Sequence, residues 1–322
     1  MEDATAVDLA ERMLAGDQRA LAQLMSHVER HSAEVPEIMR RIAPALGRAY
    51  CVGITGPPGA GKSTITDKLT ASARQQGKTV GIIAVDPTSP FSGGALLGDR
   101  IRMQQHYLDA GVFIRSMATR GSHGGLPQAA RGVRKLLDAF GKDLILIETV
   151  GVGQTELDIV EAADTTVVIL VPESGDTIQT MKAGIMEIAD LFVINKADRD
   201  GADHMLRELR LLVHMHPRYD WWDIPVLATQ AHKDVGIVEL YETIAQHRQT
   251  LVDTGQLIMR RRQHRRQELL GLLQQRLMSR LVAQLEQHEA LLRFNEQVQE
   301  GLLDPYTAVE QILAGQDLRL RQ

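Results

Sequence analysis

Short apolar runs alternate with amphipathic stretches through the middle of the chain. The apolar runs are three to seven residues long, which is the length of buried strands, and stretches with helical spacing separate them. Such alternation predicts an α/β fold with a doubly wound, mostly parallel sheet that binds ligands at the carboxyl ends of its strands. The expected strands are 49–55, 79–85, 112–114, 144–147, 165–171, 191–194 and 226–228.

Both ends of the chain show helical spacing without strand-like runs. Three short helices are expected at 7–13, 20–28 and about 36–46, and one long helix is expected from about residue 256, before a final short helix beginning at Pro305. The long helix carries leucines at three- and four-residue steps, which predict packing either in a subunit interface or on its own domain. These leucines are Leu269, Leu270, Leu273, Leu277, Leu281, Leu285 and Leu292. We therefore expect an N-terminal helical extension (1–48), an α/β domain (49–250) and a C-terminal helical arm (251–322).

Composition narrows the possible partners and the compartment. The 322 residues include 36 Lys and Arg against 41 Asp and Glu, which gives a net charge of −5 and no global bias toward nucleic acid or membrane. Neither a secretory signal nor a membrane span is readable, and the single cysteine, Cys51, lies in an expected buried strand, so we expect a cytoplasmic protein. The basic cluster at residues 260–266 is interpreted as a solvated helical face, and the pair Trp221-Trp222 as packing residues.

Residues 56–63 fit the phosphate-binding loop pattern of Gly, four residues, then Gly-Lys-Ser/Thr. They lie between an expected strand and an expected helix, where glycines allow backbone N–H groups to surround a polyphosphate at a helix N-terminus. Lys62 would neutralise the β- and γ-phosphate oxygens, and the Ser63 hydroxyl would bind Mg²⁺. The expected phosphate-binding residues are Gly56, Pro57, Pro58, Gly59, Ala60, Gly61, Lys62, Ser63 and Thr64.

The sequence Asn195-Lys196-Ala197-Asp198 directly follows an expected strand and matches the Asn-Lys-x-Asp pattern that recognises guanine. Asp198 would accept hydrogen bonds from the ring N1–H and the exocyclic amine, which adenine does not offer, and the stem of Lys196 would cover the base. The sequence therefore predicts GTP or GDP as the ligand.

Acidic residues follow other expected strands. Glu148 begins Glu148-Thr149-Val150-Gly151, where a carboxylate would hold Mg²⁺ through water and the Gly151 N–H would meet the γ-phosphate. Asp86 and Asp99 either reach the same ion or serve as loop and cap residues. Val152 stands after Gly151 in place of a glutamine that orients water, which predicts slow intrinsic turnover that a partner accelerates.

These motifs, together with three further segments, resemble in order and spacing the MeaB/ArgK-type GTPases over essentially the whole chain. The further segments are residues 85–90 (VDPTSP), 93–100 (GGALLGDR) and 175–184 (GDTIQTMKAG). Glu148 in place of the commoner Asp is expected in this family. The resemblance implies a homodimeric G-protein chaperone of an adenosylcobalamin-dependent acyl-CoA mutase, which uses GTP binding and hydrolysis to gate cofactor loading and to protect or reactivate the mutase.

The resemblance also assigns roles to residues. Lys62, Asp86, Glu148 and Gly151 form the catalytic set, and Ser63, Asp86, Asp99 and Glu148 surround Mg²⁺. Asn195, Lys196 and Asp198 select guanine, with Gln230 and Ala231 supporting the base. Gln179, Lys182 and Gly184 belong to a mobile segment that signals the nucleotide state to the mutase, and the C-terminal helices form the dimer.

Departures from the family pattern leave the client open. Phe91-Ser92 replaces a more polar or basic pair, and Ala228-Thr229-Gln230-Ala231 matches the base-supporting Ser-Ala element only loosely. Residues 95–97 and 100–102 are similar to the G-domain of isobutyryl-CoA mutase fusions, which implies an isobutyryl-CoA or 2-hydroxyisobutyryl-CoA mutase as the client in place of a methylmalonyl-CoA mutase. All three types stay open. Two alternatives are a metallochaperone GTPase for nickel insertion and a nucleotide-gated scaffold with negligible hydrolysis.

Overall fold

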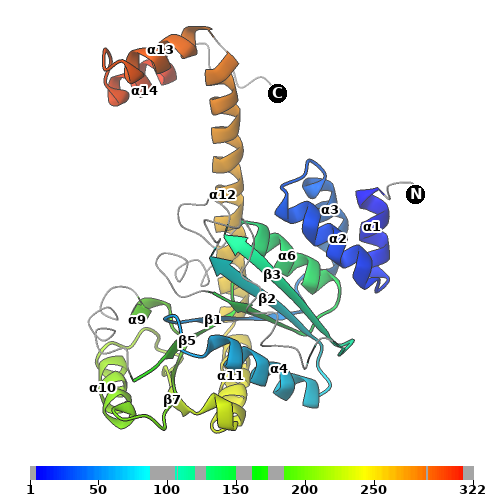
Figure 1. Cartoon of the computed structure of the whole chain (residues 1–322), viewed down its shortest axis with the longest axis vertical. Coiled ribbons are helices and arrows are strands. Elements are labelled where there is room, and N and C mark those ends of the chain that lie inside the picture. Colours follow the sequence, from blue (N-terminus) through cyan, green and yellow to red (C-terminus); the bar gives the residue numbers. More distant parts are fainter. Residues whose placement is uncertain are drawn as a thin grey trace. The chain divides into compact units, whose positions relative to one another are not determined.

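A seven-stranded parallel sheet forms the centre of the computed structural model (Figure 1). The structure describes residues 5–87, 106, 108–119, 128–149, 162–172, 185–287 and 289–314. The strand order is β3-β2-β4-β1-β5-β6-β7, and all seven predicted strands are confirmed. Their bounds are β1 Tyr50–Thr55, β2 Val80–Pro87, β3 Val112–Thr119, β4 Leu144–Glu148, β5 Thr165–Leu170, β6 Leu191–Asn195 and β7 Val226–Thr229. Because the chain leaves β1 toward β2 and returns to β5 on its other side, the strand order reverses at β1, where such sheets bind ligands.

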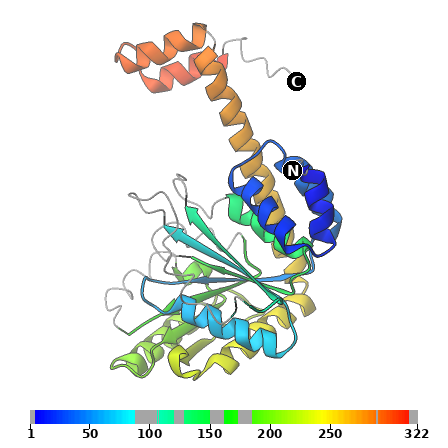
Figure 2. The same ribbon diagram turned by 45° about the vertical axis from the view of Figure 1, so that its right-hand side comes forward.

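Helices cover both faces of this sheet (Figure 2). Side chains alternate along a strand, so Cys51 packs beneath the helices of one face and Val52 beneath those of the other. The first face carries α1 Ala6–Leu14, α2 Gln18–Glu29, α3 Val35–Ile42 and α6 Gln128–Ala139; the opposite face carries α4 Lys62–Gln75 and α11 Ile237–Asp253. The helix α10 Ala202–Met215 packs on β6 and β7. The short elements are η1 Ala43–Ala45, α9 Ile185–Ile188 and η3 Ala231–Lys233.

The helix α11 was missed by the sequence analysis, which expected no element between residues 228 and 256. Its buried side chains Ile237, Leu240, Tyr241 and Ile244 have helical spacing and pack on the sheet. One turn further on, the buried residue is His247 rather than an aliphatic residue, which weakens the apolar pattern that sequence reasoning depends on.

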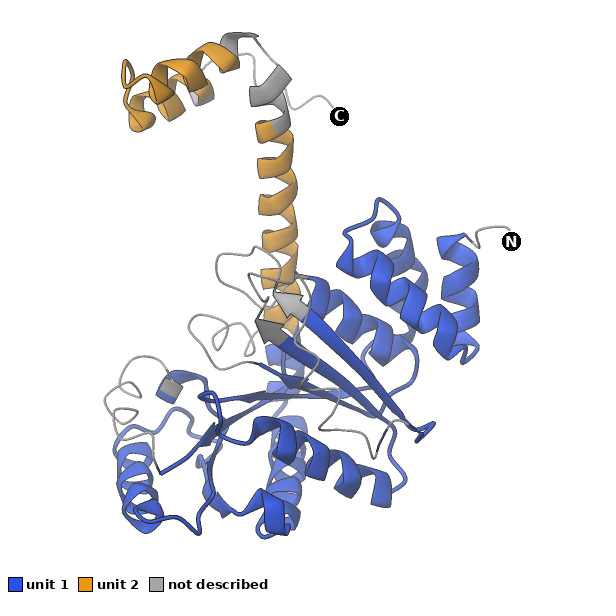
Figure 3. Ribbon diagram, viewed as in Figure 1, with its two compact units in different colours: residues 1–261 blue, residues 262–322 orange. Residues whose placement is uncertain are grey.

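The structure divides into two compact units, residues 1–261 and 262–322 (Figure 3). The long C-terminal helix is confirmed as α12 Gln256–Gln287, followed by α13 Glu289–Gln299 and α14 Pro305–Ala314. In α12 the side chains of Leu269 and Leu273 are 64% and 52% exposed. The predicted domain division at 48/49 and 250/251 stays a prediction. None of the described helices is both long and apolar enough to cross a membrane.

The first arginines of the basic cluster are not solvated, which corrects the sequence interpretation. Arg260 donates to the carboxylate of Asp190 at 2.8 and 3.1 Å, and Arg261 donates to that of Asp164 at 2.8 and 2.7 Å. Both carboxylates are buried, directly before β6 and β5. A periodic pattern reports which face a residue occupies, but it does not reveal a buried acid elsewhere in the sequence that will pair with it.

Candidate nucleotide-binding site

The phosphate-binding loop joins the carboxyl end of β1 to the first turn of α4, and two of its glycines are required by close contacts. At Gly56, where φ is 140°, a Cβ atom would lie 2.0 Å from the carbonyl oxygen of Ile169. At Gly61, where φ is 88°, a Cβ atom would lie 2.3 Å from Nδ2 of Asn195. Side chains at these positions would meet the backbone of β5 and the guanine motif, so the loop needs glycine at both.

Lys62 lies along the inside of this loop and is buried. Its ammonium group donates to the carbonyl oxygens of Gly56 and Pro57 at 2.9 and 3.0 Å. The amine is therefore held at the loop itself, at the N-terminus of α4, where the helix dipole and backbone N–H groups favour an anion.

Ser63 and Glu148 meet beside the loop. The Ser63 hydroxyl donates to Oε1 of Glu148 at 2.5 Å, and both side chains are buried. Register places Glu148 opposite Ile54 of β1 and Ala84 of β2. The loop hydroxyl and the strand-end carboxylate thus form a pair of buried oxygen groups, the ligand type that Mg²⁺ prefers, so these residues fit a magnesium site.

Asp86 lies in β2, two residues beyond Ala84, so its backbone reaches the same edge of the sheet as Glu148. The side chain of Asp86 is outside the described part of the structure. The other predicted residues outside the described ranges are Asp99, Gly151, Gln179, Lys182 and Gly184.

Asn195 connects three segments of the site. Its Nδ2 donates to the carbonyl oxygen of Ala60 at 2.8 Å. Its Oδ1 accepts from the Thr229 hydroxyl and from the Ala231 N–H, each at 3.1 Å. Asn195 therefore ties the phosphate loop to the segment after β7 in this structure, and the Lys196 backbone that follows adopts the left-handed conformation, with φ of 57°.

Asp198 lies beside the side chains of Lys233 and His232, which the sequence analysis missed. Lys233 donates to Oδ2 of Asp198 at 3.2 Å, and Nε2 of His232 lies 3.8 Å from the same oxygen. The hydrogen bond from Lys233 holds the pKa of the Asp198 carboxyl below its ordinary value. The available signal was the position of these residues directly after Ala231, in the segment that Asn195 brings to the guanine motif. Only an ionised carboxylate keeps both of its oxygens free of a proton and able to accept hydrogen bonds.

Gln230 contributes to the structure of the site through its backbone. It forms an isolated antiparallel bridge with Val235, which closes the loop containing Lys233. The side chain of Lys68 in α4 pairs with Asp234 at 2.8 Å and ties this loop to the helix of the phosphate site.

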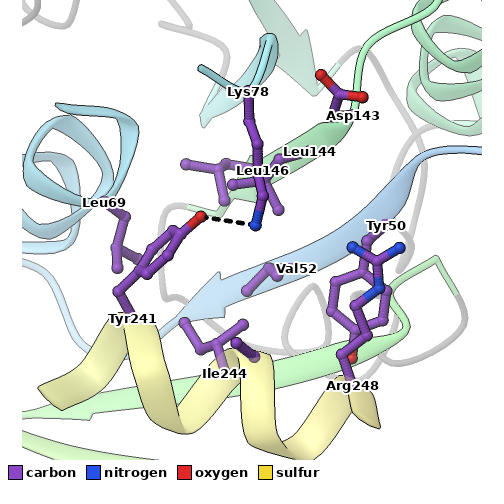
Figure 4. Close-up of a pocket in the computed structure, with 11 residues that line it drawn as sticks. Tyr50, Val52, Leu69, Lys78, Asp143, Leu144, Leu146, Tyr241, Ile244 and Arg248 are labelled. Carbon is purple, nitrogen blue, oxygen red and sulfur yellow. Dashed lines mark hydrogen bonds between the residues drawn. The ribbon is translucent and has the colours of Figure 1, made fainter. Parts of the chain in front are cut away.

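A separate small cavity lies near the amino ends of the strands, away from the phosphate loop (Figure 4). It has a volume of about 40 Å³ and lies among Tyr50, Lys78, Leu146 and Tyr241, with the Lys78 ammonium donating to the Tyr241 hydroxyl at 3.0 Å. Tyr50 and Leu144 begin their strands, whereas the phosphate loop follows a strand end. This cavity is too small for a nucleotide and has room for about two or three water molecules.

Sequence comparison decides the family to which this site belongs. Residues 18–286 match the family model described as Methylmalonyl Co-A mutase-associated GTPase MeaB. The chain is a member of the MeaB family. The resemblance to MeaB/ArgK-type GTPases is thus confirmed, and the parallel sheet is that of a P-loop GTPase.

Relatives of this MeaB-family chain cover nearly its full length. A Pyrococcus abyssi protein whose name describes a GTPase is 50% identical over 311 residues, covering 95% of both chains. GTPase ArgK of Escherichia coli is 34% identical over 326 residues, covering 97% of both. The crystal structure of a LAO/AO transport system kinase superposes with a TM-score of 0.69 at 28% identity, covering 97% of both chains. The chain is accordingly a GTPase, which converts GTP to GDP and phosphate.

Proposed function

We propose that this GTPase is magnesium-dependent and acts as a homodimeric G-protein chaperone of an adenosylcobalamin-dependent acyl-CoA mutase. The observation that carries the nucleotide chemistry is the pairing of Ser63 with Glu148 beside the loop amine of Lys62. The association of the MeaB family with methylmalonyl-CoA mutase, given in its description, supports the choice of partner.

The side chains of the loop act on the phosphates. Lys62 exchanges its hydrogen bonds with Gly56 and Pro57 for the β- and γ-phosphate oxygens, where its charge offsets the negative charge that develops as water attacks. Ser63 and Glu148 would hold Mg²⁺, with Asp86 and Asp99 as further candidates; the ion would neutralise phosphate charge.

Guanine recognition belongs to the segments that Asn195 joins. Asp198, beside Lys233, would accept hydrogen bonds from the base, and Lys196, Gln230 and Ala231, which lie in the same segments, would line it. Gly151 would sense the γ-phosphate, and Gln179, Lys182 and Gly184 would report the nucleotide state to the mutase. Since Val152 follows Gly151, we expect slow turnover until the partner binds.

Dimerisation through the C-terminal helices explains the exposed leucines of α12. Leu269, Leu270 and Leu273 are each more than half exposed, although fully burying one leucine contributes roughly 1.5–3 kcal/mol. Replacing Leu269 and Leu273 with Gln should convert a dimer to a monomer in sedimentation measurements, whereas Gln275→Ala, at an exposed position on the opposite face of the same helix, should leave the mass unchanged. A dimer that survives the double Gln replacement would contradict this interface.

The partner is tested by affinity capture from the native host with the chain loaded with GTP analogue or GDP. We expect an adenosylcobalamin-dependent acyl-CoA mutase to be captured in a nucleotide-dependent amount, and the purified mutase to accelerate phosphate release. Lys62→Ala serves as the matched nucleotide-deficient variant. Capture of the mutase without any effect of the nucleotide, or turnover that the mutase does not change, would contradict the chaperone proposal.

The same experiment identifies the client. Adding methylmalonyl-CoA, isobutyryl-CoA or 2-hydroxyisobutyryl-CoA to the captured mutase, with adenosylcobalamin, distinguishes the three enzymes by the substrate that is rearranged. Loading of adenosylcobalamin onto the apo-mutase should depend on GTP, and Lys62→Ala should abolish that dependence.

A further inference from the structure

A second hollow, of about 440 Å³, lies beside α10 and away from the phosphate loop. It is formed by the C-terminal half of α10, the segment that follows it and the first residue of β7. The predicted nucleotide-binding residues are at the carboxyl ends of the strands. Val226 is the first residue of β7, so the hollow lies at the opposite, amino-terminal end of the strands. Its volume is in the range of about 300–1,000 Å³ that is typical of small-molecule sites.

Three of the lining side chains are fixed by the protein backbone. Trp222 donates from Nε1 to the carbonyl oxygen of Asp190 at 2.9 Å. Arg210 donates to the carbonyl oxygen of Val226 at 3.1 Å, and Arg218 donates to that of Ala189 at 3.2 Å. These bonds hold the indole and both guanidinium groups at the hollow, which lowers the entropic cost of binding a ligand there.

Arg218 and Trp222 have additional support. The guanidinium carbon of Arg218 lies 4.7 Å from the centroid of the Tyr219 ring. The Trp222 ring lies 4.7 Å from the ring of the buried His247. Each of these side chains therefore has a backbone hydrogen bond and a ring contact that restrict its rotation.

The chemistry of the lining is amphipathic and mostly cationic. Arg210 and Arg218 carry permanent positive charges, and Asp223 contributes one negative charge at the same hollow. The apolar part comes from Trp222 and Ile224, with valine and proline side chains beside them. A ligand that matches this surface has an apolar body and an acidic group.

We propose that this hollow is a binding site for a small organic anion, whose acid group is held by Arg210 and Arg218 and whose body lies against Trp222 and Ile224. The guanidinium groups suit a carboxylate because their planar N–H donors match its oxygens. Asp223 opposes a purely anionic ligand by like-charge repulsion. This proposal is independent of the GTPase function.

Trp222 supplies the readout. The chain has two tryptophans, so Trp221→Phe leaves Trp222 as the single emitter, inside the proposed site. The probe is cyclohexane dicarboxylate, with uncharged cyclohexane dimethanol and inorganic phosphate as matched controls. We expect saturable emission changes with the dicarboxylate, weaker binding at higher salt, and weaker or no saturation with either control.

Variants that remove either a positive or a negative charge from the lining test whether binding depends on the charge of the site. In the Trp221→Phe background, Arg210→Gln and Arg218→Gln should each raise the dissociation constant about tenfold, because each removes a charge-assisted hydrogen bond. Asp223→Asn should lower it about twofold. Arg207→Gln, on the same helix but outside the lining, should leave it unchanged.

Unchanged GTP turnover in every variant would show that the fold is intact. The proposal is overturned if the dicarboxylate produces no saturable change, if dimethanol binds equally well, or if the Arg210 and Arg218 variants bind with the affinity of Arg207→Gln. An Asp223→Asn variant that binds more weakly would also overturn it, since the acid would then assist the ligand.

Discussion

The hydroxyl of Ser63 donates to Oε1 of Glu148 across 2.5 Å, although the two residues are 85 positions apart in sequence. The bond joins the first turn of α4 to the last residue of β4. Both groups are buried and offer oxygen atoms at the end of the sheet where the phosphate loop lies. The hydroxyl and the carboxylate that we propose to hold Mg²⁺ are therefore already next to each other in this structure.

Glu148→Gln should lower GTP turnover by roughly ten- to hundredfold and raise the Mg²⁺ concentration needed for half-maximal rate. The amide keeps the shape of the carboxylate but removes its charge, and losing an outer-sphere partner of a metal typically costs that much. Phosphate release measured over a Mg²⁺ titration checks both effects. Glu242→Gln, on the exposed side of α11, is the control, and equal Mg²⁺ requirements in the two variants would contradict the role of Glu148.

Asp198→Ala should lose roughly ten- to hundredfold of the preference for GTP over ATP, because Asp198 is the group expected to read the guanine edge. Competition binding with the two nucleotides measures this ratio. Asp200→Ala changes an exposed acid two residues further on and should keep the wild-type ratio. If Asp198→Ala also keeps it, the guanine assignment is wrong.

Asn195→Ala should weaken GTP binding and lower the free energy of unfolding by about 2 kcal/mol, because it leaves buried partners at Ala60, Thr229 and Ala231 unsatisfied. Nucleotide titration and urea denaturation measure the two effects. Thr243→Ala, which removes a hydroxyl bonded at an exposed position of α11, should change the free energy far less. Loss of stability with unchanged GTP affinity would show that the bridge through Asn195 does not shape the site.

The strands and the phosphate loop could be predicted because their signals are local. The apolar run before Gly56 and the eight-residue loop specify a strand, a turn and a helix without knowledge of any distant residue. The leucine spacing likewise predicted the C-terminal helix α12.

Contacts between distant segments could not be read in the same way. Nothing near Asn195 indicates that its amide reaches Ala60, 135 positions earlier, and nothing near Asp198 identifies Lys233 as its partner. Arg260 pairs with Asp190 because the first turns of α12 lie near the residue that precedes β6. The sequence does not show this proximity, and the basic run was therefore interpreted as solvated. These relationships arise from packing, which a single sequence does not display.

The buried His247 gives the fold a pH dependence of definite sign. Burial lowers the pKa of His247 to about 4, well below its ordinary value of 6.5. The folded protein therefore keeps this histidine neutral while the unfolded chain gains a proton as the pH falls below 6.5. Stability contributed by the neutral state is present above pH 6.5 and decreases by about 1.4 kcal/mol per pH unit down to about pH 4.

Replacing His247 with Gln should remove this dependence while leaving a group that can bond the Thr165 hydroxyl, which now lies 2.8 Å from Nδ1. The free energy of unfolding, measured in urea at pH 7.5, 6.0 and 5.0, should fall less steeply with acidity in His247→Gln than in the wild type. His204→Gln alters a histidine that is 69% exposed and should keep the wild-type slope. Because His247→Gln and His204→Gln each remove one histidine, the difference between their slopes compares the buried histidine with the exposed one. Equal slopes in the two variants would mean that His247 is protonated in the folded state at pH 5.0, contrary to its burial against Trp222.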